Sequence, residues 1–399
     1  MTDPLFSDGK VDLADVLIVV GKAGFVFVLL LVTVLMLIWL ERKVVADMQN
    51  RIGPNRAGPF GILQSLADGV KLFFKEQSIP DSADKPVFRL APYLSVVPAF
   101  LAFSVIPLGD TITIGNRTTY VQLAEVPIGV LFVIAMSGIG VYGVMLAGWA
   151  SGSKYPLLGG VRATAQMISY EAALGLATVG AILHANTLST RGLVIEQGPW
   201  EGLSTVGQWF FLATPVSFAI FVVAMIAETN RAPFDLVEAE QELVGGFHTE
   251  YTGVRFAIFF LAEYMNMVTM SAMAVTLFLG GPAGPHIDVF PHIWPVVWFL
   301  SKVSVFIFLY FWLRATLPRL RYDQLMDLGW RVLIPAAILW LAAVAVFRVG
   351  NDQDWPIAVT LPVVVVGALV IMGFLWNSMP KREPLIRGAN TPNEDVHHG

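Results

Sequence analysis

The stretch RAPFDLVEAEQELVGG, residues 231–246, concentrates carboxylates in a chain that is 56% hydrophobic and only 14% charged. Its acids are Asp235, Glu238, Glu240 and Glu242, and Glu250 follows closely. Asp235 is a good N-cap and Glu238, three residues later, fits a capping box, so a capped helix explains these two acids. It explains the later acids poorly. Because crowded carboxylates can share protons, the stretch favours a proton-loading cluster over a helix cap alone.

Ionisable residues also fall within or at the ends of apolar segments, where charge is costly. They are Glu171, Glu228, Glu263 and Lys302. At 1.5 Å per residue, Glu171 lies about 10 Å and Glu263 about 14 Å inside the expected spans. Each costs roughly 2.5–3.5 kcal/mol to insert and is typical of a bundle interior or a hydrated cavity. A proton path is favoured for the carboxylates over a structural hydrogen bond. For Lys302, a counter-ion role and a relay role are equally supported.

The residue types exclude several kinds of site. The chain has no cysteine, which excludes disulfides, thiolate zinc sites and Cys-ligated iron–sulfur clusters within it. Its six histidines show no pair at the helical spacing of a haem or metal site. We therefore expect no metal site and no redox centre in this chain. No nucleic-acid motif is present, so no nucleic-acid partner is expected.

Long apolar runs predict an all-α polytopic membrane protein. The expected bundle has about nine transmembrane helices, an amphipathic interfacial helix and an acidic cytoplasmic loop. The spans fall near 15–40, 90–109, 126–149, 165–186, 208–227, 254–280, 293–315, 332–348 and 357–376. This gives a core of residues 1–350 with eight spans, an additional span within 351–376 and a polar cytoplasmic tail at 377–399.

Most Lys and Arg residues outside the spans follow the odd-numbered spans. By the positive-inside rule, this places the N-terminus outside and the C-terminus in the cytoplasm of a multi-pass protein. The acidic stretch then lies on the cytoplasmic side. Between residues 57 and 76, Leu63, Leu66, Val70 and Phe73 share one helical face. This segment suits a helix lying in the membrane interface, either as a structural surface helix or as one wall of an entrance for a lipid-soluble substrate.

Four long motifs resemble a known family. They are LERKVVADMQNRIGPNRAGPFGILQSLADGVKLFFKE (Leu40–Glu76), GWASGSKYPLLGGVRATAQMISYE (Gly148–Glu171), AETNRAPFDLVEAEQELVGGFHTEY (Ala227–Tyr251) and RATLPRLRYDQLMDLGWR (Arg314–Arg331). The chain resembles, from about residue 15 to 350, the quinone-site membrane subunit of respiratory complex I, the proton-pumping NADH:quinone oxidoreductase. The family pattern ends after the eighth span, so the ninth span and the tail are a departure from it.

The resemblance assigns roles to matching residues. Those implied near the quinone entry are Glu41, Arg42, Arg51, Arg56 and Asp68. Those implied in proton relay and coupling are Glu171, Glu228, Asp235, Glu238, Glu240, Glu242, Glu250 and Glu263, to which we add Lys302 from its depth. Those implied in a cytoplasmic docking face are Arg314, Arg319, Arg321 and Asp323. The chain would thus form a quinone chamber and couple quinone reduction to proton pumping.

The resemblance also implies what the chain works with. Quinone, either ubiquinone or menaquinone, would be the substrate, with no covalently bound cofactor. NADH, flavin and iron–sulfur clusters would belong to partner subunits. The partners would be peripheral-arm quinone-site subunits, antiporter-like membrane subunits and membrane lipid, in a bacterial plasma (inner) membrane. The alternatives are a homologous subunit of a membrane-bound hydrogenase or related oxidoreductase, an ion or solute transporter, and a purely structural anchor.

Overall fold

The computed structural model describes residues 3–6, 12–114, 117–198, 209–236, 244–285 and 293–353, with six isolated positions between 362 and 373. Seven helices in these ranges are long and apolar enough to cross a membrane, and an eighth apolar helix, α8, is shorter. The long helices begin with α1 (Leu13–Met48), α3 (Lys85–Phe103), α4 (Gly129–Ala150) and α5 (Lys154–Ala185). The later ones are α8 (Pro215–Glu228), α10 (Gly253–Phe278), α11 (Trp294–Thr316) and α13 (Ile334–Asp352). The prediction of a helical multi-pass membrane protein is confirmed.

Shorter elements connect the long helices. They are the 3-10 turns Pro4–Phe6, Pro59–Gly61 and Gly246–His248, with α2 (Gln64–Phe74), α6 (Thr190–Glu196), α7 (Phe210–Ala213) and α12 (Tyr322–Asp327). A π-helical segment, Leu328–Leu333, joins α12 to α13, so the expected eighth span is one continuous helical run. The ninth span and the tail lie outside the described residues apart from the isolated positions.

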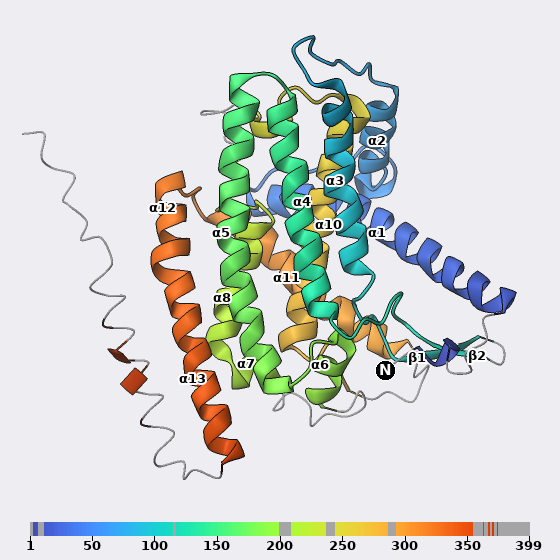
Figure 1. Ribbon diagram of the computed structural model, residues 1–399. Coiled ribbons are helices and arrows are strands. Elements are labelled where there is room, and N and C mark those ends of the chain that lie inside the picture. Colours follow the sequence, from blue (N-terminus) through green and yellow to red (C-terminus); the bar gives the residue numbers. More distant parts are fainter. Residues whose placement is uncertain are drawn as a thin grey trace, which may run out of the picture.

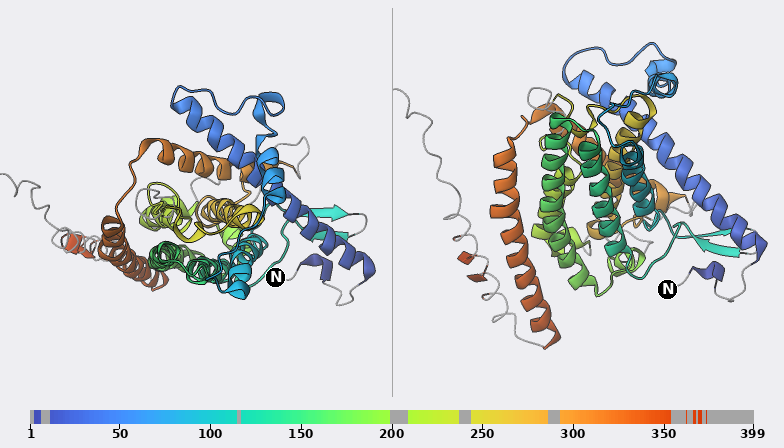
Figure 2. Two further views of the ribbon diagram at one scale, coloured as in Figure 1. Left: turned by 90° about the horizontal axis from the view of Figure 1, so that it is seen from above. Right: turned by 45° about the horizontal axis from the view of Figure 1, so that its top comes forward.

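Helix α10 forms the centre of the bundle and α1 lies at its edge. In the most apolar window of α10, 72% of the residues are buried, against 22% for α1. The end of α10 is lined with methionines and small residues that pack on α3, α8 and α11. Helix α1 runs obliquely across the bundle, whereas α4 and α5 run alongside each other (Figures 1 and 2). A tilted, exposed α1 leaves room beside α10 for a cavity.

A β-hairpin at one end of the bundle is not predicted by the hydropathy pattern. Strand β1 (Thr111–Ile114) pairs antiparallel with β2 (Arg117–Tyr120). The signal in the sequence is TITIGNRTTY, in which β-branched residues flank a Gly-Asn turn dipeptide. The hairpin holds the start of α1, because Arg117 forms ion pairs with Asp12 and Asp15. It lies at the opposite end of the molecule from α2 (Figure 1).

Helix α5 begins at Lys154, earlier than the expected 165, because its first turns are too polar for hydropathy to identify them as a span. These turns pack very closely. A Cβ on Gly159 would lie 2.6 Å from the Cα of Gly246, and one on Gly148 would lie 2.5 Å from the carbonyl oxygen of Pro156. The expected depth of Glu171 is counted from residue 165, whereas the helix begins at Lys154, so this depth stays a prediction.

Candidate functional site

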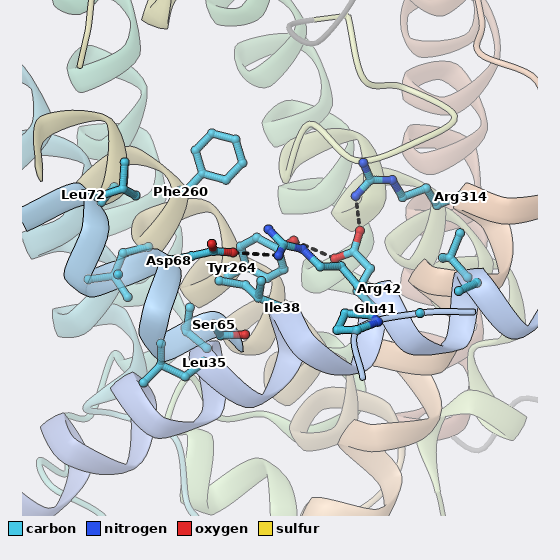
Figure 3. Close-up of a pocket in the computed structure, with 18 of the residues that line it drawn as sticks. Leu35, Ile38, Glu41, Arg42, Ser65, Asp68, Leu72, Phe260, Tyr264 and Arg314 are labelled. Atoms are coloured by element: carbon cyan, nitrogen blue, oxygen red, sulfur yellow. Dashed lines mark hydrogen bonds and ion pairs between the residues drawn. The ribbon is translucent and has the colours of Figure 1, made fainter. Parts of the chain in front are cut away.

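A cavity with a volume of about 900 Å³ lies between α1, α2 and α10 (Figure 3). We call it the main cavity. Its walls are mostly apolar, with Leu35 and Ile38 from α1, Leu72 from α2 and Phe260 from α10. A few polar side chains enter it, among them Glu41, Arg42, Asp68, Tyr264 and Arg314. Apolar walls with a few convergent polar groups are typical of a small-molecule site.

Glu41 is the buried anion of this cavity, with 4% of its surface exposed. Its carboxylate accepts a hydrogen bond of 2.7 Å from the Tyr264 hydroxyl and forms an ion pair with Arg314. Arg231 Nη1 lies 3.5 Å from the same carboxylate. Two guanidinium groups and a phenol offset the cost of burying this charge. Glu41 is therefore held ionised at a fixed place in the cavity wall.

Arg42 and Asp68 connect α1 to α2 beside the cavity (Figure 3). Arg42 Nη1 lies 2.7 Å from Asp68 Oδ2, and Gln64 Nε2 donates to the other carboxylate oxygen at 3.2 Å. Partial burial alone would raise the pKa of Asp68. The hydrogen bond and charge of Arg42 outweigh that effect and hold the pKa below its usual range. The pair thus remains charged at neutral pH and fixes α2 against α1.

Arg51 and Arg56, the other two residues expected near the quinone entry, lie in different places relative to the main cavity. Arg51 lines the main cavity and its Nε donates to Gln49 at 2.7 Å. Arg56 is exposed and is not among the residues that line the cavity. The apolar face of α2 points outward, since Leu66, Val70 and Phe73 are all about half exposed or more. A face of this kind on the cavity's outer wall is typical of contact with a membrane or another subunit.

A second, smaller cavity of about 50 Å³ gathers acids from three segments. Glu228 ends α8, Asp235 follows it in the loop, and Glu263 comes from α10. Asn230, His248 and Asn266 also line this second cavity. Acids that are distant in sequence are therefore brought to one polar chamber, next to the main cavity.

Glu171 approaches the same region through α4. Glu228 is 3% exposed and accepts a hydrogen bond of 2.8 Å from Ser137 Oγ on α4. The next residue, Gly138, faces Glu171, because a Cβ at Gly138 would lie 2.9 Å from Glu171 Oε1. The two carboxylates are close enough for their charges to interact. Two adjacent residues of α4, Ser137 and Gly138, thus contact Glu228 from α8 and Glu171 from α5.

The family model described as NADH dehydrogenase matches residues 21–345 of this chain, which contain both cavities. The chain belongs to the NADH dehydrogenase family. It is 53% identical over 363 residues to the H-type NADH-quinone oxidoreductase subunit of Frankia alni, an alignment that covers 89% of this chain and 78% of that protein. It is 54% identical over 361 residues to the protein of the same name from Frankia casuarinae, again over 89% and 78% of the two chains.

Lys302 lies apart from the acids in this NADH dehydrogenase family member. Its ammonium donates to three backbone carbonyls, those of Leu279 at 2.7 Å, Gly281 at 2.9 Å and Ala283 at 2.7 Å. The Nζ also lies 4.3 Å from the centre of the Trp209 ring. All three N–H groups are thus directed at the end of α10, where the carbonyls lack helical partners. This geometry favours the counter-ion interpretation over the relay.

The residues expected to form a docking face are exposed to different degrees. Arg314 lines the main cavity beside Glu41. Arg319 Nη2 lies 3.4 Å from Asp235 Oδ2, and so links the segment after α11 to the acidic loop. Arg321 and Asp323 are strongly exposed and form a long ion pair of 3.9 Å. All four expected residues keep accessible surface, because 40% of the Arg314 side chain and 40% of the Arg319 side chain are exposed. Their role in docking stays a prediction.

The acidic loop itself is only partly described. Glu238, Glu240 and Glu242 lie outside the described residues, as does the helix expected to follow the Asp235 cap. Glu250 is half-buried in the segment that follows the 3-10 turn Gly246–His248. The proton-loading role of this cluster stays a prediction.

Three residues at the site were missed by sequence reasoning. Arg231 lies between the two cavities, Tyr264 hydrogen-bonds to Glu41, and Ser137 hydrogen-bonds to Glu228. In the sequence, Arg231 contributes only to the cytoplasmic charge. Tyr264 directly follows Glu263 in sequence, and this neighbouring acid could have marked it as a candidate. Ser137 lies within an apolar helix, where nothing in the sequence sets it apart. Among the described residues, no group of three or more His, Asp or Glu residues is arranged to hold a metal ion.

Proposed function

We propose that this chain is the membrane subunit of a proton-translocating NADH:quinone oxidoreductase that forms the quinone entry and binding chamber. The observation that carries the proposal is the main cavity, with its apolar walls and its charged group at Glu41 and Arg314. A quinone has an isoprenoid tail that suits apolar walls and two carbonyl oxygens that suit fixed donors. Ubiquinone and menaquinone share these features. The two Frankia relatives are named as quinone oxidoreductase subunits.

The entry would be the gap between α1 and α2. Of the seven helices of membrane length in the described residues, only the last, Tyr322–Gly350, is less buried than α1, and α2 exposes an apolar face beside α1. A lipid-soluble molecule could pass from the bilayer along these apolar surfaces without crossing water. The Arg42–Asp68 pair would hold the two helices at the spacing that the molecule needs.

Electrons would come from partner subunits. The chain has no cysteine and therefore no Cys-ligated cluster of its own. NADH, flavin and iron–sulfur clusters would be held by peripheral-arm subunits that dock over the end of the bundle carrying α2. This chain would hold the quinone and respond to the charge that reduction creates.

The response would pass through the carboxylates around the second cavity to antiporter-like membrane subunits. Glu228, Asp235 and Glu263 share that cavity, and Glu171 approaches Glu228 from α5. Buried carboxylates this close change protonation together, because each charge affects its neighbours strongly in a low dielectric. Glu250 and the acids at 238, 240 and 242 would load protons on the aqueous side.

The end that carries α2 would face the cytoplasm of a bacterial inner membrane. The basic residues cluster in the segments after α1, α4, α8 and α11, and these segments favour the inner face. The N-terminus would then be outside and the C-terminal tail at 377–399 inside, after the additional span. Arg321 and Asp323 would belong to the surface that meets the peripheral arm.

The proposal is tested by filling the main cavity. Gly69 lines this cavity, and a Cβ built on it meets no atom within 4 Å. Gly69→Trp in the assembled complex should abolish NADH oxidation by quinone while sparing NADH oxidation by a hydrophilic acceptor. Gly175→Trp on α5 is the matched control, since Gly175 also has open space and lies outside both cavities. Full quinone reduction by Gly69→Trp would overturn the proposal.

A further inference from the structure

Arg231 is positioned between the main cavity and the second cavity by the end of α8. The helix stops at Glu228, Thr229 caps it, and Asn230 adopts a left-handed conformation with φ of 51°. The backbone N–H of Arg231 then donates to the carbonyl of Ile226 at 3.3 Å. This turn directs the side chain inward, where only 7% of it is exposed.

The guanidinium touches one carboxylate on each side. Its Nη1 lies 3.5 Å from Glu41 Oε1, and its Nε lies 3.0 Å from Glu263 Oε1. Its central carbon lies 4.1 Å from the centre of the Tyr264 ring. Tyr264 donates its hydroxyl to Glu41, so the ring holds the guanidinium and one of its two carboxylates together. Glu41 lines the main cavity and Glu263 lines the second.

The charges therefore alternate along one line, from Arg314 through Glu41 and Arg231 to Glu263. A buried cation shared by two anions stabilises both, and a change at one anion changes how strongly it stabilises the other. Burial alone would lower the pKa of Arg231, but the charges of Glu263, Tyr264 and Glu41 raise it well above its usual value. Arg231 thus remains a permanent cation while its neighbours change charge.

We propose that Arg231 is a positioning residue that transmits the charge state of Glu41 and the main cavity to Glu263. This inference rests on the proposed function, because it explains how a change of charge at the quinone site would reach the carboxylates of the second cavity. Negative charge in the main cavity draws the guanidinium toward Glu41, which weakens its hold on the Glu263 anion and favours proton uptake there. Loss of charge at Glu41 has the opposite effect, and Glu263 then favours proton release.

Other charged and titratable groups lie beside these four residues, and the test variants must leave them unchanged. They are Glu228 at the end of α8, Tyr310 and Arg314 on α11, Tyr264 on α10, and Asp235 and His248 around the second cavity. Among the ion pairs of the described residues, those of Arg231 reach both Glu41 and Glu263, one on each side of the boundary between the cavities. The transmission is therefore assigned to Arg231.

The test is a set of pH profiles of quinone reduction by the assembled complex in membrane vesicles. Glu41→Gln should shift the profile by about half a pH unit or more, equivalent to about a threefold change in proton affinity. The same substitution should cause no shift when combined with Arg231→Gln or with Glu263→Gln. Tyr264→Phe, which removes one contact to Glu41, should shift the profile in the same direction by less. Arg331→Gln is the matched control, because Arg331 pairs with half-exposed Asp327 and lines neither cavity. In the Arg331→Gln background, Glu41→Gln should shift the pH profile by the full amount.

Two results would overturn the inference. The first is an equal Glu41→Gln shift with and without Arg231, and the second is no shift in the wild-type background. If Arg231→Gln does not assemble, Arg231→Lys decides the question, since a single ammonium cannot span both carboxylates and should reduce the shift by at least half. The Gly69→Trp experiment judges the proposed function separately. If Gly69→Trp blocks quinone reduction but the shift persists without Arg231, only the inference fails.

Discussion

The hydroxyl of Tyr264 on α10 donates a hydrogen bond of 2.7 Å to the carboxylate of Glu41 on α1. It joins the most buried of the long helices to one of the least buried, across the wall of the main cavity. The tilted α1 makes few other polar contacts with α10 among the described residues. The position of Glu41 in the cavity therefore depends on this hydroxyl and on two guanidinium groups.

Tyr264→Phe should lower quinone reduction about tenfold while leaving the amount of assembled complex unchanged. A hydrogen bond to a charged group contributes about 1.5–3 kcal/mol, and its loss leaves Glu41 with only the arginines. Steady-state rates with quinone and with a hydrophilic acceptor measure the effect. Wild-type rates with both acceptors would contradict a role for this contact.

The sequence predicted the helices far better than the contacts between them. Apolar length identifies the seven helices of the described residues that are long and apolar enough to cross a membrane, because a span must match the thickness of the bilayer. The expected span at 208–227 contains α7 and the shorter α8 instead. Hydropathy does not reveal the start of α5, because Lys154 and Arg162 lower the mean hydropathy of its first turns. It also overlooks the hairpin at 111–120, whose strands are too short to stand out.

Site residues were predictable where their charge was unusual for their surroundings. Glu171, Glu228 and Glu263 are acids in or beside apolar helices, and the structure brings Glu228 and Glu263 to the second cavity and Glu171 close to Glu228. Glu41 was expected from the resemblance, and it lines the main cavity. Arg231 looked like an ordinary basic residue of a loop. Its importance comes from the carboxylates that its side chain meets, Glu41 on α1 and Glu263 on α10, which are distant from it in sequence.

Asp68→Asn should raise the KM for quinone less than fivefold. The Arg42–Asp68 pair is partly exposed, with half of the Arg42 side chain accessible, and exposed pairs contribute about 0–1 kcal/mol. Its lowered pKa means that the ion pair is fully present above the ordinary pKa of an aspartate, about 3.9, and is lost only as pH falls through the lower folded value. Asp68→Asn should therefore leave the shape of the pH profile between about pH 5 and 8 unchanged. A changed shape would mean that Asp68 titrates in that range.

Lys302→Met should destabilise the complex rather than uncouple it. The substitution leaves the carbonyls of Leu279, Gly281 and Ala283 without their donor, at a cost of at least about 3 kcal/mol. Thermal inactivation of the solubilised complex should occur several degrees lower, with Lys154→Met on the exposed start of α5 as the control. Normal stability with lost proton pumping would instead support the relay interpretation.

Glu125→Gln should stabilise the protein, and the gain should increase with pH. Burial raises the pKa of Glu125, and its Oε2 is buried without a hydrogen-bond donor among the described residues. A raised folded pKa favours the protonated acid, so the carboxyl is best tolerated at low pH and costs stability as pH rises through the folded value. The thermal midpoint of Glu125→Gln should exceed that of the wild type more at about pH 8 than at about pH 5. Glu196→Gln, at an exposed acid on α6, should show no such difference.

The central claim is that quinone occupies the main cavity, and photolabelling of the assembled complex tests it most directly. A photoreactive quinone analogue should label peptides from the second half of α1, from α2 and from the segment of α10 that contains Phe260. Excess natural quinone should suppress the label, and Gly69→Trp should abolish it. Labelling confined to other segments, with these three unmodified, would contradict the claim.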